Sequence, residues 1–273
     1  MIERLLVPLD GSAAAARTLI PATRLVRRLH VPLRVVSYVS ELIEHEVRSA
    51  IAEQVAELDL GDQGVSVHVG AAPESVAAAL VQECLVEPGT LTVMSTSGAG
   101  RTGSVLGSVA DGFLARGCTP VLLIGPDCDL DRFVPGRPMV VPLDGSDTAE
   151  SILPVAAYWA TMFDAVPEVV SVLEVSTSQS VAGGDLPPET ALVRAVAGRL
   201  AEQSGVAADY EVLHGDKVAQ SIVDRASHRD AALIALSTHG RTGLARLVAG
   251  SVAMEVLHRA PCPVLVHRPP DLD

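Results

Sequence analysis

The sequence predicts two tandem α/β domains, each built on a doubly wound parallel sheet of five strands. Three observations lead to this prediction: the hexapeptide VPLDGS occurs twice in 273 residues, short apolar runs alternate with amphipathic stretches, and 48% of the residues are hydrophobic. Most of these are Ala, Val and Leu, which suits buried parallel strands between Ala-rich helices. The chain is long for one core and sufficient for two domains of about 130 residues.

The internal repeat extends beyond the hexapeptide. VPLDGS stands at residues 7–12 and 141–146, and VVS stands at residues 35–37 and 169–171, so both recur 134 positions apart. Further along, Ser-Thr, RTG and GSVA start at residues 95, 101 and 107, and again at residues 237, 241 and 250. The motifs keep their order while the distance between the two copies changes slowly, which is typical of duplicated domains with loop insertions and deletions.

Five strands are expected in the first half, separated by amphipathic stretches of helical length such as ESVAAALVQECLVE at residues 74–87. The strand segments are continuous in apolar residues, which is typical of strands covered on both faces. Parallel strands with helical crossovers follow from this alternation. The expected strands are RLLVPLD (4–10), LRVVSYV (33–39), VSVHVG (65–70), TLTVMST (90–96) and PVLLIG (120–125).

The second half repeats this pattern. The segment CDLDRFVPGRP at residues 128–138 contains two prolines and a glycine, and it is the expected linker between a first domain at 1–127 and a second domain at 139–273. The expected strands of the second domain are MVVPLD (139–144), EVVSVLEV (168–175), DYEVLHG (209–215), ALIALST (232–238) and PVLVHR (263–268).

The charge of the chain argues against binding to nucleic acid. The formal net charge is −13, from 20 basic and 33 acidic residues. Both halves carry the excess, with 10 basic and 16 acidic residues in 1–136 and 10 and 17 in 137–273. Such a surface repels a phosphate backbone, and seven Phe, Trp and Tyr residues leave little for stacking on bases along a strand.

The cysteines and the hydropathy pattern predict a soluble cytoplasmic protein with no membrane contact. No CxxC or partnered His spacing is present, which favours reduced and mostly buried thiols. The apolar stretch at the N-terminus is too short for a signal peptide, and no run approaches the ~18 residues of a membrane helix. The four cysteines are Cys84, Cys118, Cys128 and Cys262.

The repeated turn Asp-Gly-Ser follows the first strand of each half, at residues 10–12 and 144–146. Ligands of open parallel sheets bind outside the carboxyl ends of the strands, where the strand order reverses. Glycine permits a tight turn there, and Ser or a neighbouring Asp can cap the following helix. Capping accounts for Gly and Ser, but a structural role is harder to state for Asp10 and Asp144, which lie on the strand side of the turn.

A glycine-rich segment follows the fourth strand of each half, STSGAGRTGSVLGSVA from Ser95 and STHGRTGLARLVAGSVA from Ser237. Each ends in Gly-Ser at the start of a helical pattern, where backbone N–H groups and a Ser hydroxyl favour a phosphate. Gly107 and Gly250 would allow the anion to approach the backbone closely. Two arginines within these loops, Arg101 and Arg241, could add charge-assisted contacts.

Other nucleotide and catalytic motifs are absent from the sequence. The single lysine, Lys217, lies outside any glycine loop, so the phosphate loop that uses a lysine is excluded. There is no GxGxxG after a first strand, no GxSxG and no HExxH. His239 lies in the second loop, but Ser97 takes its place in the first, so no catalytic residue is predicted.

These residues carry a resemblance to the universal stress proteins in their tandem two-domain form, over essentially the whole chain. The VPLDGS start and the stretch STHGRTGLARLVAGSVAMEVLHRAPCPVLV at 237–266 are similar to that family. The resemblance implies flavodoxin-like domains and, for one branch, ATP binding through a loop Gly-x2-Gly-x9-Gly-Ser/Thr. Here Ser237 replaces the first glycine of the second loop, where nine residues separate Gly240 from Gly250; in the first loop eight residues separate Gly98 from Gly107.

The resemblance also implies roles for individual residues. Asp10 and Asp144 would face the nucleotide near the ribose and any metal ion, such as Mg²⁺. Val39 and Leu173, at the ends of the second strands, would offer backbone atoms to adenine. The expected phosphate ligands are Gly98, Gly107 and Ser108 in the first domain, and Gly240, Arg241, Gly250 and Ser251 in the second.

Three functions remain open from the sequence: a stress or signalling module that binds ATP without rapid turnover, a slow Mg²⁺-dependent ATPase or phosphotransferase, and an interaction protein that binds no nucleotide. The full spacing of the second loop favours stronger binding in the second domain. The terminal strands PVLLIG and PVLVHR would otherwise leave exposed edges, so the two halves are expected to pair as an internal pseudo-dimer. A further pairing of whole chains as a homodimer is left open.

Overall fold

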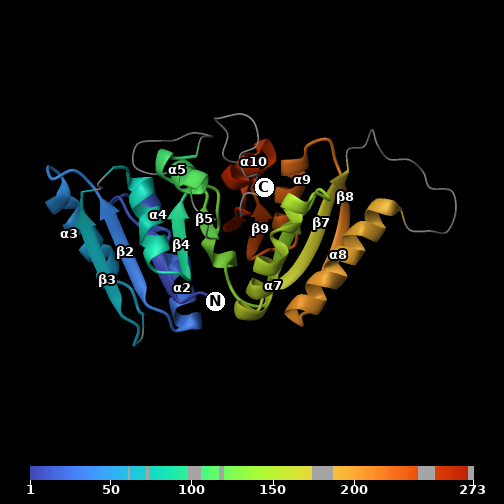
Figure 1. Ribbon diagram of the computed structural model, residues 1–273, viewed down its shortest axis with the longest axis horizontal. Helices are drawn as coiled ribbons and strands as arrows, with labels where there is room; N and C mark the ends of the chain where they lie inside the picture. The colour runs from blue at the N-terminus through green and yellow to red at the C-terminus, as the bar shows by residue number, and fades with distance from the viewer. Residues whose placement is uncertain are drawn as a thin grey trace. The chain divides into compact units, whose positions relative to one another are not determined.

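The structure is a computed structural model that describes residues 1–60, 62–71, 74–97, 106–116, 120–173, 187–238 and 250–269 (Figure 1). The chain divides into two units, Met1–Pro126 and Asp127–Asp273. Each unit contains a five-stranded sheet whose neighbouring strands are parallel. The prediction of doubly wound parallel α/β domains is therefore confirmed.

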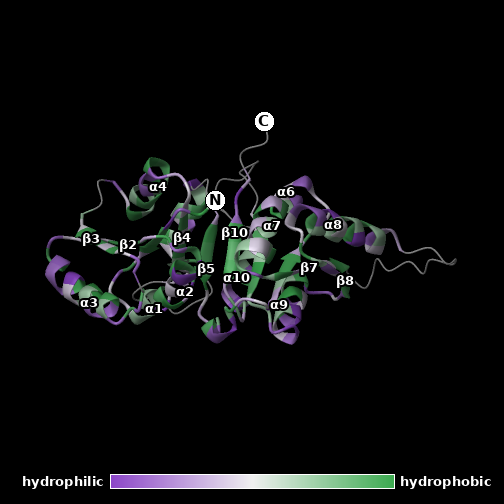
Figure 2. Ribbon diagram, turned by 90° about the horizontal axis from the view of Figure 1, so that it is seen from below, coloured by the Kyte–Doolittle hydropathy of each residue, from purple (hydrophilic) through white to green (hydrophobic). Residues whose placement is uncertain are grey.

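The first unit has the strand order β3-β2-β1-β4-β5. Figure 2 shows α4 on one face of this sheet and α1, α2 and α3 on the other. The strands are β1 (Arg4–Pro8), β2 (Leu33–Tyr38), β3 (Val65–Gly70), β4 (Thr90–Ser95) and β5 (Val121–Ile124). The helices are α1 (Ala13–Ala16), α2 (Leu19–Leu29), α3 (Glu44–Ala56), α4 (Val76–Val86) and α5 (Ser108–Arg116).

The second unit has the corresponding order β10-β9-β6-β7-β8. Its strands are β6 (Pro138–Pro142), β7 (Val166–Leu173), β8 (Asp209–His214), β9 (Leu233–Ser237) and β10 (Val264–His267). Its helices are the 3-10 helix η1 (Leu130–Arg132) and the α-helices α6 (Asp147–Glu150), α7 (Leu153–Met162), α8 (Pro188–Ser204), α9 (Val218–His228) and α10 (Ser251–Arg259).

The first strand of each unit is the centre of its core. Leu5, Leu6 and Val7 of β1 are completely buried, because helices cover both faces of the sheet and successive side chains point to opposite faces. Val140 and Val141 take the same places in β6. The order in which successive strands are added to the sheet reverses beside this strand, since β1 lies between β2 and β4, and β6 lies between β7 and β9. The carboxyl ends of β1 and β6 therefore open onto the crevice where such sheets bind ligands.

The segment 128–138, which the sequence marks as a linker, contributes to the core of the second unit. Phe133 is completely buried, and its ring stacks on Phe163 with a centroid distance of 4.4 Å. The Asp129 N–H also donates to the Pro261 carbonyl over 2.9 Å. Aromatic packing thus fixes this segment, although its proline and glycine content is typical of a connector.

A buried or half-buried ion pair holds the middle crossover helix of each unit to its sheet. In the first unit, Arg34 of β2 donates to both carboxylate oxygens of Glu83 on α4 over 2.8 and 2.7 Å. In the second, Arg225 of α9 donates to both oxygens of Glu168 on β7 over 3.3 and 2.5 Å. The basic residue is on the strand in one unit and on the helix in the other.

Candidate functional site

The Asp-Gly-Ser turns form as the sequence predicts for Gly and Ser. Gly11 and Gly145 have φ angles of +80° and +82°, a left-handed conformation that favours glycine. The Ser12 hydroxyl accepts a hydrogen bond from the Ala15 N–H over 3.2 Å and begins helix α1. Ser146 begins α6 in the same way. Both turns therefore lead from the end of a central strand directly into a capped helix.

The aspartates have a role in these turns that the sequence does not reveal. One carboxylate oxygen of Asp10 accepts hydrogen bonds from the Ser12 N–H, over 3.0 Å, and from the Ser12 hydroxyl, over 2.5 Å. Asp144 holds Ser146 identically, over 2.9 and 2.6 Å. Each aspartate thus orients the serine that caps the helix, in addition to its place at the crevice.

The N-termini of α5 and α10 lie at the same crevices. Gly107 precedes α5, and its N–H donates to the Thr96 carbonyl over 2.7 Å, which ties the helix start to the end of β4. Gly250 is the residue before α10, and the helix begins at Ser251. The first N–H groups of a helix have no partner within it and carry partial positive charge, so both helix starts favour an anion.

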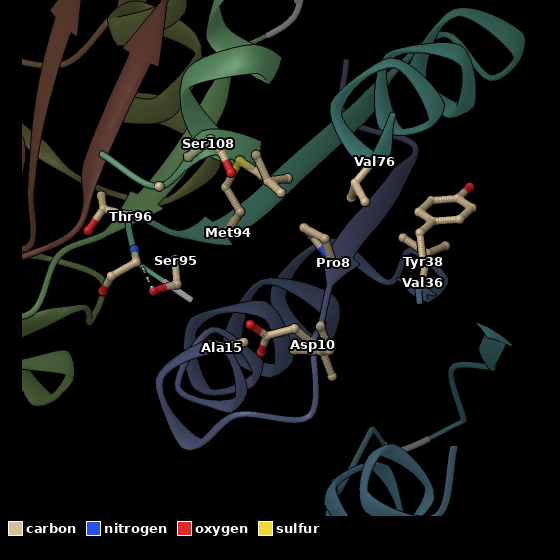
Figure 3. Close-up of a pocket in the computed structure, with 15 residues that line it drawn as sticks. Pro8, Asp10, Ala15, Val36, Tyr38, Val76, Met94, Ser95, Thr96 and Ser108 are labelled. Carbon is tan, nitrogen blue, oxygen red and sulfur yellow. Dashed lines mark hydrogen bonds between the residues drawn. The ribbon is translucent and has the colours of Figure 1, made fainter. Parts of the chain in front are cut away.

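A hollow of about 310 Å³ in the first unit brings the turn and the helix start together. Figure 3 shows Ser95, Thr96 and Ser108 at one end of this hollow, and Tyr38 and Val36 at the other. Its lining comprises Pro8, Leu9, Asp10, Ala15, Val36, Tyr38, Val76, Met94, Ser95, Thr96, Ser97, Gly107, Ser108, Val109 and Ala110.

The second unit has an equivalent hollow of about 350 Å³ at the same place in the fold. The polar groups again gather where β6 and β9 end, and the Ser151 and Ser237 hydroxyls lie 2.8 Å apart there. Its lining comprises Pro142, Leu143, Asp144, Ser146, Thr148, Ala149, Val170, Val172, Val218, Ile222, Leu236, Ser237, Gly250, Ser251, Val252 and Ala253.

Six of the expected ligand residues therefore line the two hollows, three in each unit. They are Asp10, Gly107 and Ser108 in the first, and Asp144, Gly250 and Ser251 in the second. Gly98, Gly240 and Arg241 lie outside the described residues, as do Arg101 and His239.

Val39 and Leu173 lie beside the hollows rather than on their described linings. The Val39 N–H donates to the Gly70 carbonyl over 2.8 Å, and the Leu173 carbonyl accepts from the Gly215 N–H over 3.0 Å. These backbone groups continue the parallel pairing of the sheet edge. The preceding residues, Tyr38 and Val172, contribute to the linings instead.

Sequence reasoning missed the apolar half of each hollow. Val36 and Tyr38 of β2 and Val76 of α4 line the first hollow, and Val170, Val172 and Val218 line the second. Successive side chains of a strand point to opposite faces, so residues 34, 36 and 38 lie on one face. The sequence could therefore have shown that Val36 and Tyr38 share a face. Which helix covers that face could not be read from the period.

The hollows suit a metal ion only as part of a bound nucleotide. Within the described residues no group of three or more His, Cys, Asp or Glu side chains could hold a metal ion. Each hollow offers one carboxylate, Asp10 or Asp144. Mg²⁺ is commonly held by one or two carboxylates together with substrate phosphates, so the residues present fit a nucleotide-bound Mg²⁺.

Of the helices in the described part of the chain, none combines the length and apolar character needed to cross a membrane.

The fold and the hollows define a tandem of doubly wound α/β domains with ligand crevices at the strand ends. The sequence model of the universal stress protein family matches residues 136–268. A universal stress protein of Methanocaldococcus jannaschii is 34% identical over 142 residues, which cover 49% of this chain and 83% of that protein. The chain belongs to the universal stress protein family.

Longer alignments extend over more of the chain. A universal stress protein of Mycobacterium tuberculosis is 28% identical over 208 residues, covering 74% of this chain and 69% of that protein. The crystal structure of a universal stress protein from Archaeoglobus fulgidus has a TM-score of 0.71 at 18% identity and covers 97% of this chain and 98% of its own. The fold is thus that of a solved universal stress protein across both units.

Proposed function

We propose that the protein is a stress-response or signalling module that binds an adenine nucleotide, ATP with or without Mg²⁺, and does not turn it over rapidly. The observation that carries this proposal is the pair of equivalent hollows. In each, an aspartate after the central strand and the N-terminus of a helix border one cavity of about 310 or 350 Å³. Cavities of roughly 300–1,000 Å³ hold small ligands in proteins.

The polarity of each hollow supports a nucleotide over a uniformly polar or apolar ligand. The helix start favours phosphate. The opposite end, lined in the second unit by Val170, Val172 and Val218, favours a flat apolar group such as a base. A carboxylate lies among these groups, where it can accept hydrogen bonds from ribose hydroxyls or ligate a metal ion.

The groups that the structure describes around the hollows support slow or absent turnover. Phosphoryl transfer requires a residue that positions the attacking water and cations that neutralise the developing charge. Within the described linings, neither hollow contains a histidine, lysine or arginine side chain. Binding of a phosphate requires the helix start and none of these side chains.

We keep stronger binding in the second unit as part of the proposal. Its support is the nine-residue spacing between Gly240 and Gly250, against eight residues in the first loop. An internal pseudo-dimer through the terminal strands and a cytoplasmic location also belong to it. The three described cysteines, Cys84, Cys128 and Cys262, are buried thiols, which suits a reducing compartment.

The proposal is tested on the purified full chain. Nucleotide carried through purification is expected in the supernatant of denatured protein, where its absorbance spectrum should match that of free ATP. Labelled ATP added to the protein should bind and remain largely intact. Rapid hydrolysis would identify an ATPase, and a chain that neither retains nor binds adenine nucleotides would be an interaction protein.

A further inference from the structure

The hollow of the first unit ends on an aromatic ring, and its counterpart in the second unit ends on an aliphatic side chain. Tyr38 of β2 lines the first hollow, and the position with the same register in β7 is Val172. The sequence has only seven Phe, Trp and Tyr residues, and within the described linings Tyr38 is the one that borders either hollow.

The ring of Tyr38 is held from two sides. Its hydroxyl donates to the Glu83 carboxylate over 3.4 Å, and Glu83 is itself fixed by Arg34. The His68 ring lies edge-on to it, with a centroid distance of 5.9 Å and an interplanar angle of 62°. An aromatic side chain held in this way offers a fixed flat surface at little further cost in conformational entropy.

The two ends of the first hollow match the two ends of a nucleotide. Ser108 and the helix start favour phosphate, and Tyr38, Val36 and Val76 form the apolar end (Figure 3). We propose that Tyr38 is the platform on which the base stacks in the first unit, so that this unit selects nucleotides by their base more strongly than the second unit, where Val172 takes the place of the ring. This inference rests on the proposed function.

Reciprocal exchange of the two side chains tests the inference. The first site is measured in full-length Gly250→Val protein, in which the start of α10 is blocked, and the second site in Gly107→Val protein. Calorimetric titration with ATP and with inorganic triphosphate then gives the contribution of the nucleoside at each site. Stacking of a base on an aromatic side chain corresponds to about tenfold or more in affinity.

Tyr38→Val should lower the affinity of the first site for ATP about tenfold and leave that for triphosphate unchanged. Tyr38→Phe should retain ATP binding, because it keeps the ring. Val172→Tyr should increase the preference of the second site for ATP over triphosphate. Tyr210→Val removes an exposed tyrosine of β8 and serves as the control.

Equal effects of Tyr38→Val on ATP and triphosphate, or no effect on either, would overturn the inference and leave the proposed function standing. Absence of ATP binding to the unsubstituted protein would overturn both.

A second inference follows independently from the ion pairs between helix and sheet. The charges of these ion pairs are inverted between the two units at more than one position. In the first unit the strand residue is basic and the helix residues are acidic, and in the second unit the strand residue is acidic and the helix residues are basic. Arg229 of the second unit extends the inverted network through contacts with Glu168 at 3.2 Å and Asp209 at 3.0 Å. On the strands, Arg34 of the first unit is equivalent to Glu168 of the second. At the helices, Glu83 and Glu87 of the first unit are equivalent to Arg225 and Arg229 of the second.

The inversion makes the two helices incompatible with each other's sheet. Helix α9 on the first sheet would place Arg225 beside Arg34, and α4 on the second would place Glu83 beside Glu168. The Glu168 side chain is only 2% exposed, and an unpaired or like-charged group at such a site is strongly destabilising. Homologous neighbours in one chain are prone to exchange elements during folding.

We infer that the inverted ion pairs select which crossover helix packs on which sheet, and so keep the two units, within a chain and between chains, from exchanging α4 and α9. Charge complementarity is a known means of rejecting wrong partners whose apolar surfaces are alike.

The test gives both units the same polarity and then restores the difference. Arg34→Glu with Glu83→Arg gives the first unit the polarity of the second. Because Arg229 also contacts Glu168, adding Glu168→Arg with Arg225→Glu and Arg229→Glu inverts both units and makes them distinct again. Each full-length variant is unfolded in urea and refolded at increasing protein concentration, and the monomer yield is measured by size exclusion with light scattering.

The double variant should lose monomer to exchanged dimers and larger species, and the loss should grow with concentration. The fivefold variant should recover most of the monomer. Glu83→Arg alone reports the stability cost of one mismatch by its lower thermal midpoint. A double variant that refolds as fully as the unsubstituted protein, or a fivefold variant no better than the double, would overturn the inference.

Discussion

Each aspartate of the repeated turn joins a structural contact to a place at the ligand crevice. The carboxylate of Asp144 accepts two hydrogen bonds from Ser146 and also lines the second hollow. These contacts lie at the surface of the turn, where water can replace them. Their loss should therefore cost less than the ~1 kcal/mol typical of a hydrogen bond.

Replacement of Asp144 can separate the two roles. Asp144→Asn keeps an oxygen that accepts from Ser146 but removes the charge, so the apo protein should keep its thermal midpoint while its affinity for ATP with Mg²⁺ falls. Loss of one charge-assisted contact corresponds to about 10- to 100-fold in affinity. Calorimetric titration and thermal unfolding measure the two effects. Asp144→Ala should lower affinity similarly with a small loss of stability; unchanged binding by both variants would make the residue purely structural.

At the scale of the element, the starts of α5 and α10 should contribute unequally to binding. A side chain at Gly250 or Gly107 would block close approach of a phosphate to the helix start. Gly250→Val should abolish most ATP binding and Gly107→Val little, because only the second loop has the nine-residue spacing. Titration of the two variants side by side is the measurement. Equal losses, or a larger loss from Gly107→Val, would contradict the unequal sites.

The attachment of α4 to its sheet should depend on pH. Burial alone would raise the pKa of Glu83, but the hydrogen bonds and charge of Arg34, together with the charge of Arg4 and the hydrogen bond from Tyr38, outweigh it and hold this pKa below its usual value. A depressed pKa contributes stability that is present above the unfolded value of about 4.3 and is lost as the pH falls through the folded value.

Glu83→Gln should therefore unfold with a weaker dependence on pH below about 4.3 than the unsubstituted protein. Urea unfolding followed by circular dichroism between neutral and acid pH measures this difference. Glu53→Gln, which changes an exposed glutamate of α3, is the matched control and should retain the full acid dependence. Parallel slopes for all three proteins would show that the ion pair does not link folding to pH.

At the scale of the whole molecule, the second unit depends on residues that precede its first strand. Phe133 is completely buried and stacks on Phe163, and its ring centroid lies 6.3 Å from that of Trp159. Phe133→Ala should lower the free energy of unfolding of this unit by about 3–5 kcal/mol. Trp159 is the only tryptophan of the chain, so its fluorescence in urea reports this unit. Phe133→Leu should lose much less, and equal losses would argue against the stacked cluster.

The predicted pairing of the two halves is also a property of the whole molecule. One cysteine placed in β5 and one in β10, after replacement of the natural cysteines, should form a crosslink within a single chain. The physical reason is that a terminal parallel strand exposes unpaired backbone groups. Mass spectrometry of the oxidised protein distinguishes intramolecular from intermolecular products, and exclusively intermolecular products would contradict the pseudo-dimer.

The sequence by itself determined the features that depend on neighbouring residues. The ten predicted strand segments became parallel strands. Continuous apolar runs such as β1 and β4 are buried because helices cover both faces, whereas β3 and β8, which contain more polar residues, are mostly exposed. Gly11 and Ser12 gave the left-handed turn and the helix cap because both effects act within three residues. The duplication and the family followed from the same local motifs.

Only the tertiary structure decided which distant residues meet. Arg34 and Glu83 are 49 residues apart in sequence, and Glu168 and Arg225 are 57 apart, so their pairing required the crossover helix to pack on its sheet. The same packing placed Tyr38 at one end of a hollow and Phe133 in a core. The periodicity of a strand shows which residues share a face, but the helix that covers this face is set by the route of the whole chain.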